Sequence, residues 1–146
     1  MPADVLESPF VLEYTYKRST GPVIGRFLTG LRAGKIEGVR TRSGKVLIPP
    51  TEYDPATGEA IEDWVEVGQQ GEVLTWTWVS DPEPAHPLEK PFAWALIRLD
   101  GADTALLHAV DAPRDDMVTG LRVRVRWTPE PIGSIRDIAC FEVVDG

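Results

Sequence analysis

Cysteine and histidine are almost missing from this chain of 146 residues, which has one cysteine, Cys140, and two histidines, His86 and His108. A single cysteine cannot form a disulfide within the chain, which agrees with a reducing compartment. For a metal centre, the sequence offers at most these two histidines and a carboxylate. We expect His108 to be a half-buried strand histidine, and Cys140 to be a small core residue rather than a nucleophile.

Basic charge is also scarce, because 15 lysines and arginines face 23 acidic residues and give a net charge of -8. This balance disfavours a surface that follows the phosphates of DNA or RNA. No apolar run approaches the roughly 20 residues that span a bilayer, and the N-terminal segment 2–16, which is acidic overall, lacks a signal-peptide pattern. We therefore expect a cytoplasmic protein that binds neither nucleic acid nor membrane.

The apolar residues, 42% of the chain, are enough for one folded globule. Residues 1–20 show no sustained periodicity, although residues 13–18 could form a short extended segment. Residues 21–34 predict an amphipathic helix that begins near Pro22 and ends at Gly34, with apolar residues four apart at Val23, Phe27 and Leu31. Two glycines inside this helix, Gly25 and Gly30, indicate either ordinary core packing or a close approach by another group.

Short strands follow the helix, in two groups. Residues 35–67 predict a compact module with strands at 35–40, 45–48 and 63–67. From residue 71 onward the sequence predicts five strands, at 72–80, 91–100, 104–111, 121–127 and 135–144, with a helical turn or two at 112–119. This order is typical of a five-stranded OB-fold barrel, although periodicity alone also allows another small barrel or a sandwich.

Two sets of side chains stand out on these strands. Residues 121–127 alternate so that one face carries Arg122, Arg124 and Arg126. The first two barrel strands carry two aromatic pairs, Trp76 with Trp78 and Phe92 with Trp94, which could stack on each other. We expect these pairs to form a mixture of barrel core and docking surface, and Trp127 is a further candidate for that surface. The acidic charge disfavours a nucleic-acid stacking platform. No nucleophile, phosphate loop or acid–base pair has a diagnostic spacing, and we expect Asp100, Asp103 and Asp111 to serve turn geometry.

Residues 40–58 contain two short turns that end at Gly44 and Gly58 and resemble the knuckles of a zinc ribbon. Each knuckle has two positions three apart, where a zinc ribbon carries cysteine. These positions hold Arg40, Ser43, Asp54 and Thr57, which cannot supply the four N or S ligands of structural zinc. We expect the two glycines and an Asp54-Pro55 turn, in which Asp54 accepts backbone N–H bonds, to specify the knuckles instead.

These features together resemble the DUF35 family of zinc-ribbon and OB-fold proteins, which associate with thiolases and thiolase-like enzymes that act on acyl-CoA. The similarity covers the helix, the ribbon with Pro49-Pro50 before its second knuckle, the Gly71-Glu72-Val73 step and the run at 91–111. The runs at 99–108 and 135–141 resemble the branch that works with thiolase-like aldolases of steroid side-chain degradation.

The resemblance implies a mainly β protein in which an N-terminal arm and helix (1–34) and a degenerate, zinc-free rubredoxin-like ribbon (35–67) precede a five-stranded OB-fold barrel (68–146). It implies no cofactor and a non-catalytic subunit that is required by an aldolase of the sterol-carrier-protein thiolase type, in a heterotetramer. The partner would cleave β-hydroxyacyl-CoA steroid side chains by a retro-aldol reaction. Candidates for the interface or the acyl-CoA channel are Arg40, Tyr53, Trp76, Trp78, Phe92, Trp94 and His108. The alternative is a free-standing acyl-CoA-binding module in which Arg122, Arg124 and Arg126 hold the CoA phosphates.

Overall fold

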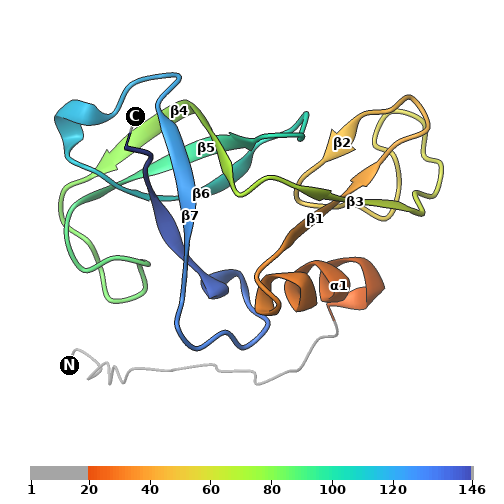
Figure 1. The fold of residues 1–146 in the computed structure, drawn as a ribbon, viewed down its shortest axis with the longest axis horizontal. Coiled ribbons are helices and arrows are strands. Elements are labelled where there is room, and N and C mark those ends of the chain that lie inside the picture. Colours follow the sequence, from red (N-terminus) through yellow and green to blue (C-terminus); the bar gives the residue numbers. More distant parts are fainter. Residues whose placement is uncertain (1–19, 146) are drawn as a thin grey trace, which may run out of the picture.

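The computed structural model describes residues 20–145, so the N-terminal arm expected before the helix, including the segment at 13–18, lies outside the described residues. Figure 1 shows a closed barrel on one side, a small three-stranded ribbon on the other, and a single labelled helix that runs below the ribbon. The predicted fold class, mainly β with an OB-fold barrel, is confirmed. No helix within residues 20–145 has the length and apolar character needed to span a membrane.

Helix α1 (Gly21–Arg32) forms where the periodicity predicted it, and it buries Phe27, Gly30 and Leu31. Gly34 follows its end with φ +76°, a conformation that glycine adopts easily. A Cβ atom on Gly30 would lie 3.3 Å from the carbonyl oxygen of Lys35. The group that approaches this glycine is therefore the chain itself as it turns back into the ribbon, which favours the packing interpretation.

The ribbon contains strands β1 (Ile36–Arg40), β2 (Val46–Leu47) and β3 (Asp63–Val67), in the order β2-β1-β3 with antiparallel pairing. Strand β2 is shorter than predicted. At Gly38, a Cβ atom would lie 2.6 Å from the carbonyl oxygen of Leu47, so the backbone of the ribbon packs closely enough to require glycine there.

Five strands close the barrel in the order β4-β5-β6-β8-β7: β4 (Gln70–Val79), β5 (Phe92–Leu99), β6 (Leu106–Asp111), β7 (Arg122–Trp127) and β8 (Ile138–Val143). The predicted helical turn between the third and fourth strands is the 3₁₀ helix η1 (Arg114–Asp116). At Gly71, strand β4 pairs with both β5 and β7, and a Cβ atom would overlap the carbonyl group of Arg98. Gly71 therefore lies where β4 and β5 approach too closely for a side chain.

Residues 135–137 were expected to begin the last strand but form the 3₁₀ helix η2 (Ile135–Asp137). A capping box is the cause: the Ser134 hydroxyl accepts a hydrogen bond from the Arg136 amide at 3.2 Å, and Asp137 caps the Ser134 amide in return. The carboxylate of Asp137 also accepts hydrogen bonds from the amides of Ile132 and Gly133. These bonds hold the turn closed, so β8 begins only at Ile138.

Candidate functional site

The first ribbon knuckle is held together by local hydrogen bonds. The Thr41 amide donates to the Lys45 carbonyl at 2.8 Å, and the Gly44 amide donates to the Thr41 carbonyl at 2.9 Å. The buried hydroxyl of Thr41 accepts from the Lys45 amide and lies 2.9 Å from the hydroxyl of Ser43. Thr41, which the sequence argument did not single out, is therefore the organising side chain of this turn.

The second knuckle is organised by Asp54, as predicted. Its carboxylate accepts a hydrogen bond from the Ala56 amide at 2.8 Å, and its carbonyl accepts one from the Gly58 amide at 2.7 Å. Gly58 has φ +74°, and the Thr57 hydroxyl accepts from the Glu59 amide. Both turns are thus specified by local hydrogen bonds and by glycine, the residue that best tolerates a positive φ.

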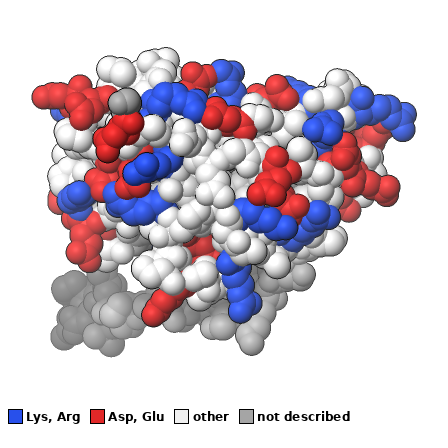
Figure 2. All heavy atoms as spheres, in the orientation of Figure 1, with Lys and Arg blue, Asp and Glu red and all other residues white. Residues whose placement is uncertain are grey.

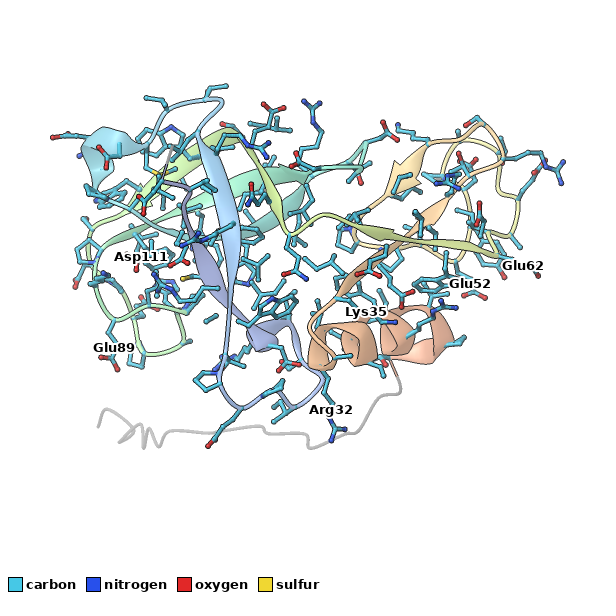
Figure 3. All side chains as sticks on the ribbon, in the orientation of Figure 1. Arg32, Lys35, Glu52, Glu62, Glu89 and Asp111 are labelled. Carbon is cyan, nitrogen blue, oxygen red and sulfur yellow. The ribbon has the colours of Figure 1, made fainter. Side chains whose placement is uncertain are left out.

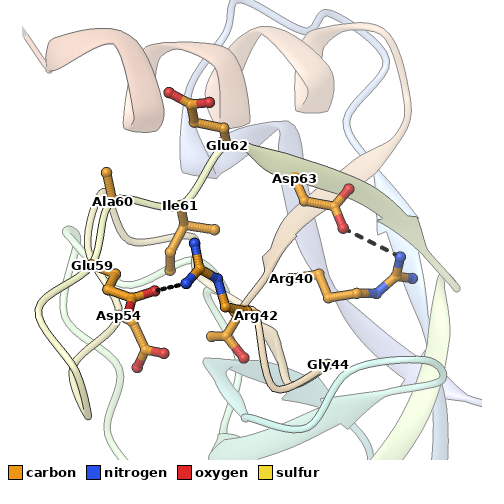
Figure 4. A pocket seen from close by; sticks show the side chains of 10 residues that line it. Arg40, Arg42, Gly44, Asp54, Glu59, Ala60, Ile61, Glu62 and Asp63 are labelled. Carbon is orange, nitrogen blue, oxygen red and sulfur yellow. Dashed lines mark hydrogen bonds and ion pairs between the residues drawn. The ribbon is translucent and has the colours of Figure 1, made fainter.

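Ion pairs flank the hollow between the knuckles, which has a volume of about 380 Å³. Figure 4 shows Arg42 directed at Glu59 and Arg40 directed at Asp63, each at an N–O distance of 3.5 Å. Both pairs are exposed, so each contributes little stability. Within residues 20–145, no group of three or more histidines, cysteines or carboxylates is placed to hold a metal ion. The absence of zinc from the folded protein remains a prediction.

The side chains and backbone of the barrel loop between β5 and β6 form hydrogen bonds to the backbone of the ribbon. The carboxylate of Asp103 accepts from the Val46 amide at 2.7 Å, and the Asp103 amide donates to the Val46 carbonyl at 2.9 Å. The Thr104 hydroxyl both accepts from the Ile48 amide and donates to the Ile48 carbonyl, at 2.7 and 2.8 Å. Asp103 was expected to serve its own turn, but its carboxylate instead fixes the ribbon to the barrel.

The two aromatic pairs do not stack on each other, contrary to expectation. In the β4–β5 register, Trp76 lies opposite Ala95 and Trp78 opposite Ala93, whereas Phe92 lies opposite Val79 and Trp94 opposite Thr77. Because side chains directly opposite each other share a face, the two pairs lie on opposite faces of this ladder. Trp76 and Trp78 pack against the main core, and Phe92 and Trp94 belong to a separate cluster.

This second cluster buries Phe92, Ala109 and Cys140 on the outside of the barrel wall, packed with Val79, Leu88 and Trp94. The His86 ring comes from the Pro-rich loop, residues 80–91 between β4 and β5, and packs edge-on against Phe92 and Trp94 at centroid distances of 5.5 and 6.2 Å. Burial is the largest influence on the Cys140 thiol and raises its pKa to about 11. The prediction that Cys140 is a small core residue is confirmed by its burial.

The groove formed by parts of β6, β8, η2 and the Pro-rich loop has a volume of about 510 Å³. It brings together three residues singled out in the sequence, His86, Trp94 and His108. His108 is only 5% exposed, more deeply buried than expected, and its Nδ1 accepts a hydrogen bond from the Ala109 amide at 2.8 Å. Burial lowers the pKa of His108, against the opposing effect of backbone groups, so its imidazole is neutral at pH 7.

The three arginines of β7 form ion pairs rather than an open cationic face. Arg122 makes two bonds to Asp100, at 2.9 and 2.6 Å, and Arg124 binds Glu142 at 3.0 Å. Arg126 bridges Glu142 and Asp111. Hydrogen bonds from Arg124 and Arg126 lower the pKa of Glu142 below its usual range. A phosphate would have to displace these carboxylates, which disfavours the CoA-phosphate assignment.

Charges of both signs are interspersed over the face drawn in Figure 2, above the barrel as well as above the ribbon. The other two candidates lie on the ribbon, where Arg40 ends β1 and Tyr53 is 55% exposed in the loop before β3. The seven interface candidates therefore lie in three places. Trp76, Trp78 and Phe92 pack in the hydrophobic clusters, Trp94 and His108 line the groove, and Arg40 and Tyr53 lie on the ribbon.

Comparisons with known proteins agree with this architecture. The model of a family described as the C-terminal OB-fold domain of ChsH2 matches residues 64–128. A DUF35 domain-containing scaffold protein of Pyrococcus furiosus is 24% identical over 91 residues, which are 62% of this chain and 67% of that protein.

Two solved structures are also similar. A DUF35-family protein of unknown function from Sulfolobus solfataricus aligns with a TM-score of 0.60 and 25% identity, over 73% of this chain and 78% of its own. A chain of the Ltp2-ChsH2(DUF35) aldolase aligns with a TM-score of 0.63 and 18% identity, over 87% of this chain and 98% of its own, which shows a shared fold. The resemblance to DUF35 proteins is thereby confirmed.

Proposed function

We propose that this chain, a relative of DUF35 proteins, is the non-catalytic subunit of a thiolase-like aldolase. The observation that carries the proposal is its likeness, over nearly the whole of both chains, to a chain of the Ltp2-ChsH2(DUF35) aldolase. The description of the Pyrococcus relative as a scaffold protein supports the same role. In this proposal the partner cleaves β-hydroxyacyl-CoA steroid side chains in the cytoplasm by a retro-aldol reaction, and the two proteins form a heterotetramer.

The chemistry of the described residues agrees with a non-catalytic role. The Cys140 thiol has a raised pKa of about 11 and is fully buried, so it is a poor nucleophile at neutral pH. His108 is buried with Nδ1 already engaged, and His86 accepts a hydrogen bond from the Glu83 amide within its own loop. Neither histidine is paired with a nucleophile in residues 20–145, so the catalytic groups of the proposed reaction belong to the partner.

The burial of the candidate residues indicates which of them stabilise this chain and which could contact a partner. The two hydrophobic clusters include the aromatic rings of Phe92, Trp76 and Trp78, which therefore stabilise this chain itself. Arg40 and Tyr53 lie at the ribbon surface and are candidates for docking. Trp94 and His108 line the groove and are candidates for a channel that the two proteins share.

Co-expression with a thiolase-like aldolase from the same organism tests the proposal. We expect the two proteins to elute together in size-exclusion chromatography at the mass of two copies of each. The purified chain alone should not cleave a β-hydroxyacyl-CoA, and the partner's activity should depend on this chain. Cleavage by the isolated chain at the rate of the complex would contradict the proposal, and so would full activity of the partner without it.

A further inference from the structure

The groove between β6 and β8 exists because this parallel pair separates along its length. Within the described residues, the two strands pair at Val110 with Phe141 and at Asp111 with Glu142. The earlier part of β6 therefore has no pairing with β8. Along the chain η2 directly precedes β8, and its residues Ile135 and Arg136 line the groove together with Leu107 and His108 of β6. The barrel wall thus opens into a groove of about 510 Å³, within the range of small-molecule sites.

The walls of the groove are mainly apolar. The barrel strands contribute Trp94, Leu107 and Ile138, while Ile135 comes from η2 and Pro87 from the Pro-rich loop. Leu107 and Ile135 are 58% and 41% exposed, so large aliphatic side chains remain accessible at its rim. An apolar ligand in the groove would remove this surface from water, which stabilises the bound state.

The charge of the groove favours an anion. Arg136 is the one formally charged residue in its lining, and the Thr128 hydroxyl also belongs to that lining. The Nδ1 atoms of His86 and His108 already accept hydrogen bonds from the amides of Glu83 and Ala109. No carboxylate belongs to that lining, although the whole chain carries a net charge of -8. The nearby carboxylate of Asp137 is directed at the amides of Ile132, Gly133 and Ser134. Glu89 of the Pro-rich loop does not line the groove either, and Figure 3 shows it at the outer edge of the molecule.

Arg136 also differs from the arginines of β7. Arg122, Arg124 and Arg126 are each neutralised by a carboxylate, whereas Arg136 has no ion-pair partner among residues 20–145. A guanidinium group that is free of a carboxylate can form a charge-assisted, two-point contact with an incoming one. The groove therefore offers one cationic anchor beside a continuous apolar wall.

We infer that this groove binds an amphipathic monocarboxylate, a molecule with one carboxylate head and an extended hydrocarbon body. The carboxylate binds Arg136 at the rim, and the hydrocarbon lies against Trp94, Leu107 and Ile138. The neutral, buried His108 forms part of the floor. The inference concerns the isolated chain and does not depend on the proposed aldolase partner.

Titration of the ¹⁵N-labelled protein with decanoate below its micelle concentration tests the inference. We expect saturable binding of one decanoate per chain, with amide shifts grouped at Leu107, Arg136 and Ala139 and at the indole N–H of Trp94. Decyltrimethylammonium, which has the same chain and the opposite charge, should bind at least about tenfold more weakly. Acetate, which has the head without the chain, should produce no grouped shifts.

Substitutions separate the two parts of the site. Arg136→Gln should weaken decanoate binding about tenfold and leave decanol binding unchanged, while Arg136→Lys should retain most of the affinity. Leu107→Asp should weaken both ligands, and Arg114→Gln, an exposed arginine on η1, should change neither. Equal affinity for the anionic and cationic chains would overturn the inference. Shifts centred on the ribbon, or full decanoate affinity in Arg136→Gln, would also overturn it.

Discussion

Asp103 and Val46 exchange two hydrogen bonds across the junction between barrel and ribbon, one from the Val46 amide to the Asp103 carboxylate at 2.7 Å and one from the Asp103 amide to the Val46 carbonyl at 2.9 Å. Val46 is buried, so its amide has little access to water if the carboxylate is removed. Thr104 repeats the arrangement at Ile48. Asp103 and Thr104 therefore fix strand β2 of the ribbon and the residue after it to the barrel.

Asp103→Ala should therefore lower the free energy of unfolding by about 1–3 kcal/mol, because it leaves a buried amide without an acceptor. Urea denaturation measures the change, and hydrogen exchange should become faster at the amides of Val46 and Ile48. Asp103→Asn keeps an acceptor oxygen and should recover part of the loss. Asp115→Ala, in η1, is the matched control and should have little effect. An unchanged unfolding free energy in Asp103→Ala would show that the junction is held by packing alone.

Much of the fold was predictable because it depends on local periodicity. The alternation at 121–127 predicted β7, and the spacing of Val23, Phe27 and Leu31 predicted α1. Strand register was not predictable, since it depends on pairing between distant segments. This is why the sequence placed Trp76 and Trp94 near each other, whereas the β4–β5 register places them on opposite faces.

The roles of single polar residues were predictable only where their partners are local. Asp54 binds an amide two residues away, and the Asp-Pro turn indicated this. Asp103 binds an amide 57 positions away, so nothing in its neighbourhood distinguished it from an ordinary turn residue. The groove was missed for the same reason, because it forms only when His86, His108 and Arg136 are brought together by the barrel.

The Cys140 thiol should be unreactive in the folded protein. With a pKa of about 11, roughly one thiol in a thousand is ionised at pH 8, and the Pro-rich loop covers the cluster around it. Labelling with a thiol-specific disulfide reagent should therefore be slow until urea unfolds the chain. His86→Ala removes the ring that packs on Phe92 and should speed labelling of the folded protein. Rapid labelling of the unmodified protein at pH 8 would contradict this account.

The same pKa shift predicts a loss of stability in alkali. Burial raises the pKa of Cys140 from 9.0 to about 11, so its contribution to stability is fully present below pH 9 and is lost as the pH rises through about 11. Cys140→Ala removes this dependence. We expect the unfolding free energy of the unmodified protein to fall more steeply between pH 9 and 11 than that of the variant. Parallel curves for the two proteins would contradict the shift.

Metal independence is the next prediction, since Arg40, Ser43, Asp54 and Thr57 stand at the four knuckle positions. Elemental analysis should find well under one zinc per chain, and a chelator should leave the melting temperature unchanged. Stoichiometric, tightly bound zinc would contradict it.

Replacing all four knuckle residues by cysteine provides a converse test, because the backbone hydrogen bonds of both turns, from Gly44 to Thr41 and from Gly58 to Asp54, do not involve the replaced side chains. We expect this variant to bind one zinc ion per chain. A variant with cysteine at only two of the positions is the control and should bind zinc much more weakly. Failure of the four-cysteine variant to bind zinc would show that the knuckles no longer face each other as a ribbon site requires.

The last prediction separates docking from stability. Tyr53 is 55% exposed on the ribbon, whereas Trp78 packs against the barrel core, so the two aromatic residues should respond differently to removal. Tyr53→Ala should weaken association with the aldolase partner by about 2 kcal/mol if the ribbon docks there, and should leave the melting temperature nearly unchanged. Trp78→Ala should lower the melting temperature of the isolated chain. Val118→Ala, also 55% exposed but located between η1 and β7, should alter neither property. Hydrogen exchange with and without the partner locates the interface directly, and protection confined to residues 105–127, with none in the ribbon, would show that the partner binds a different face.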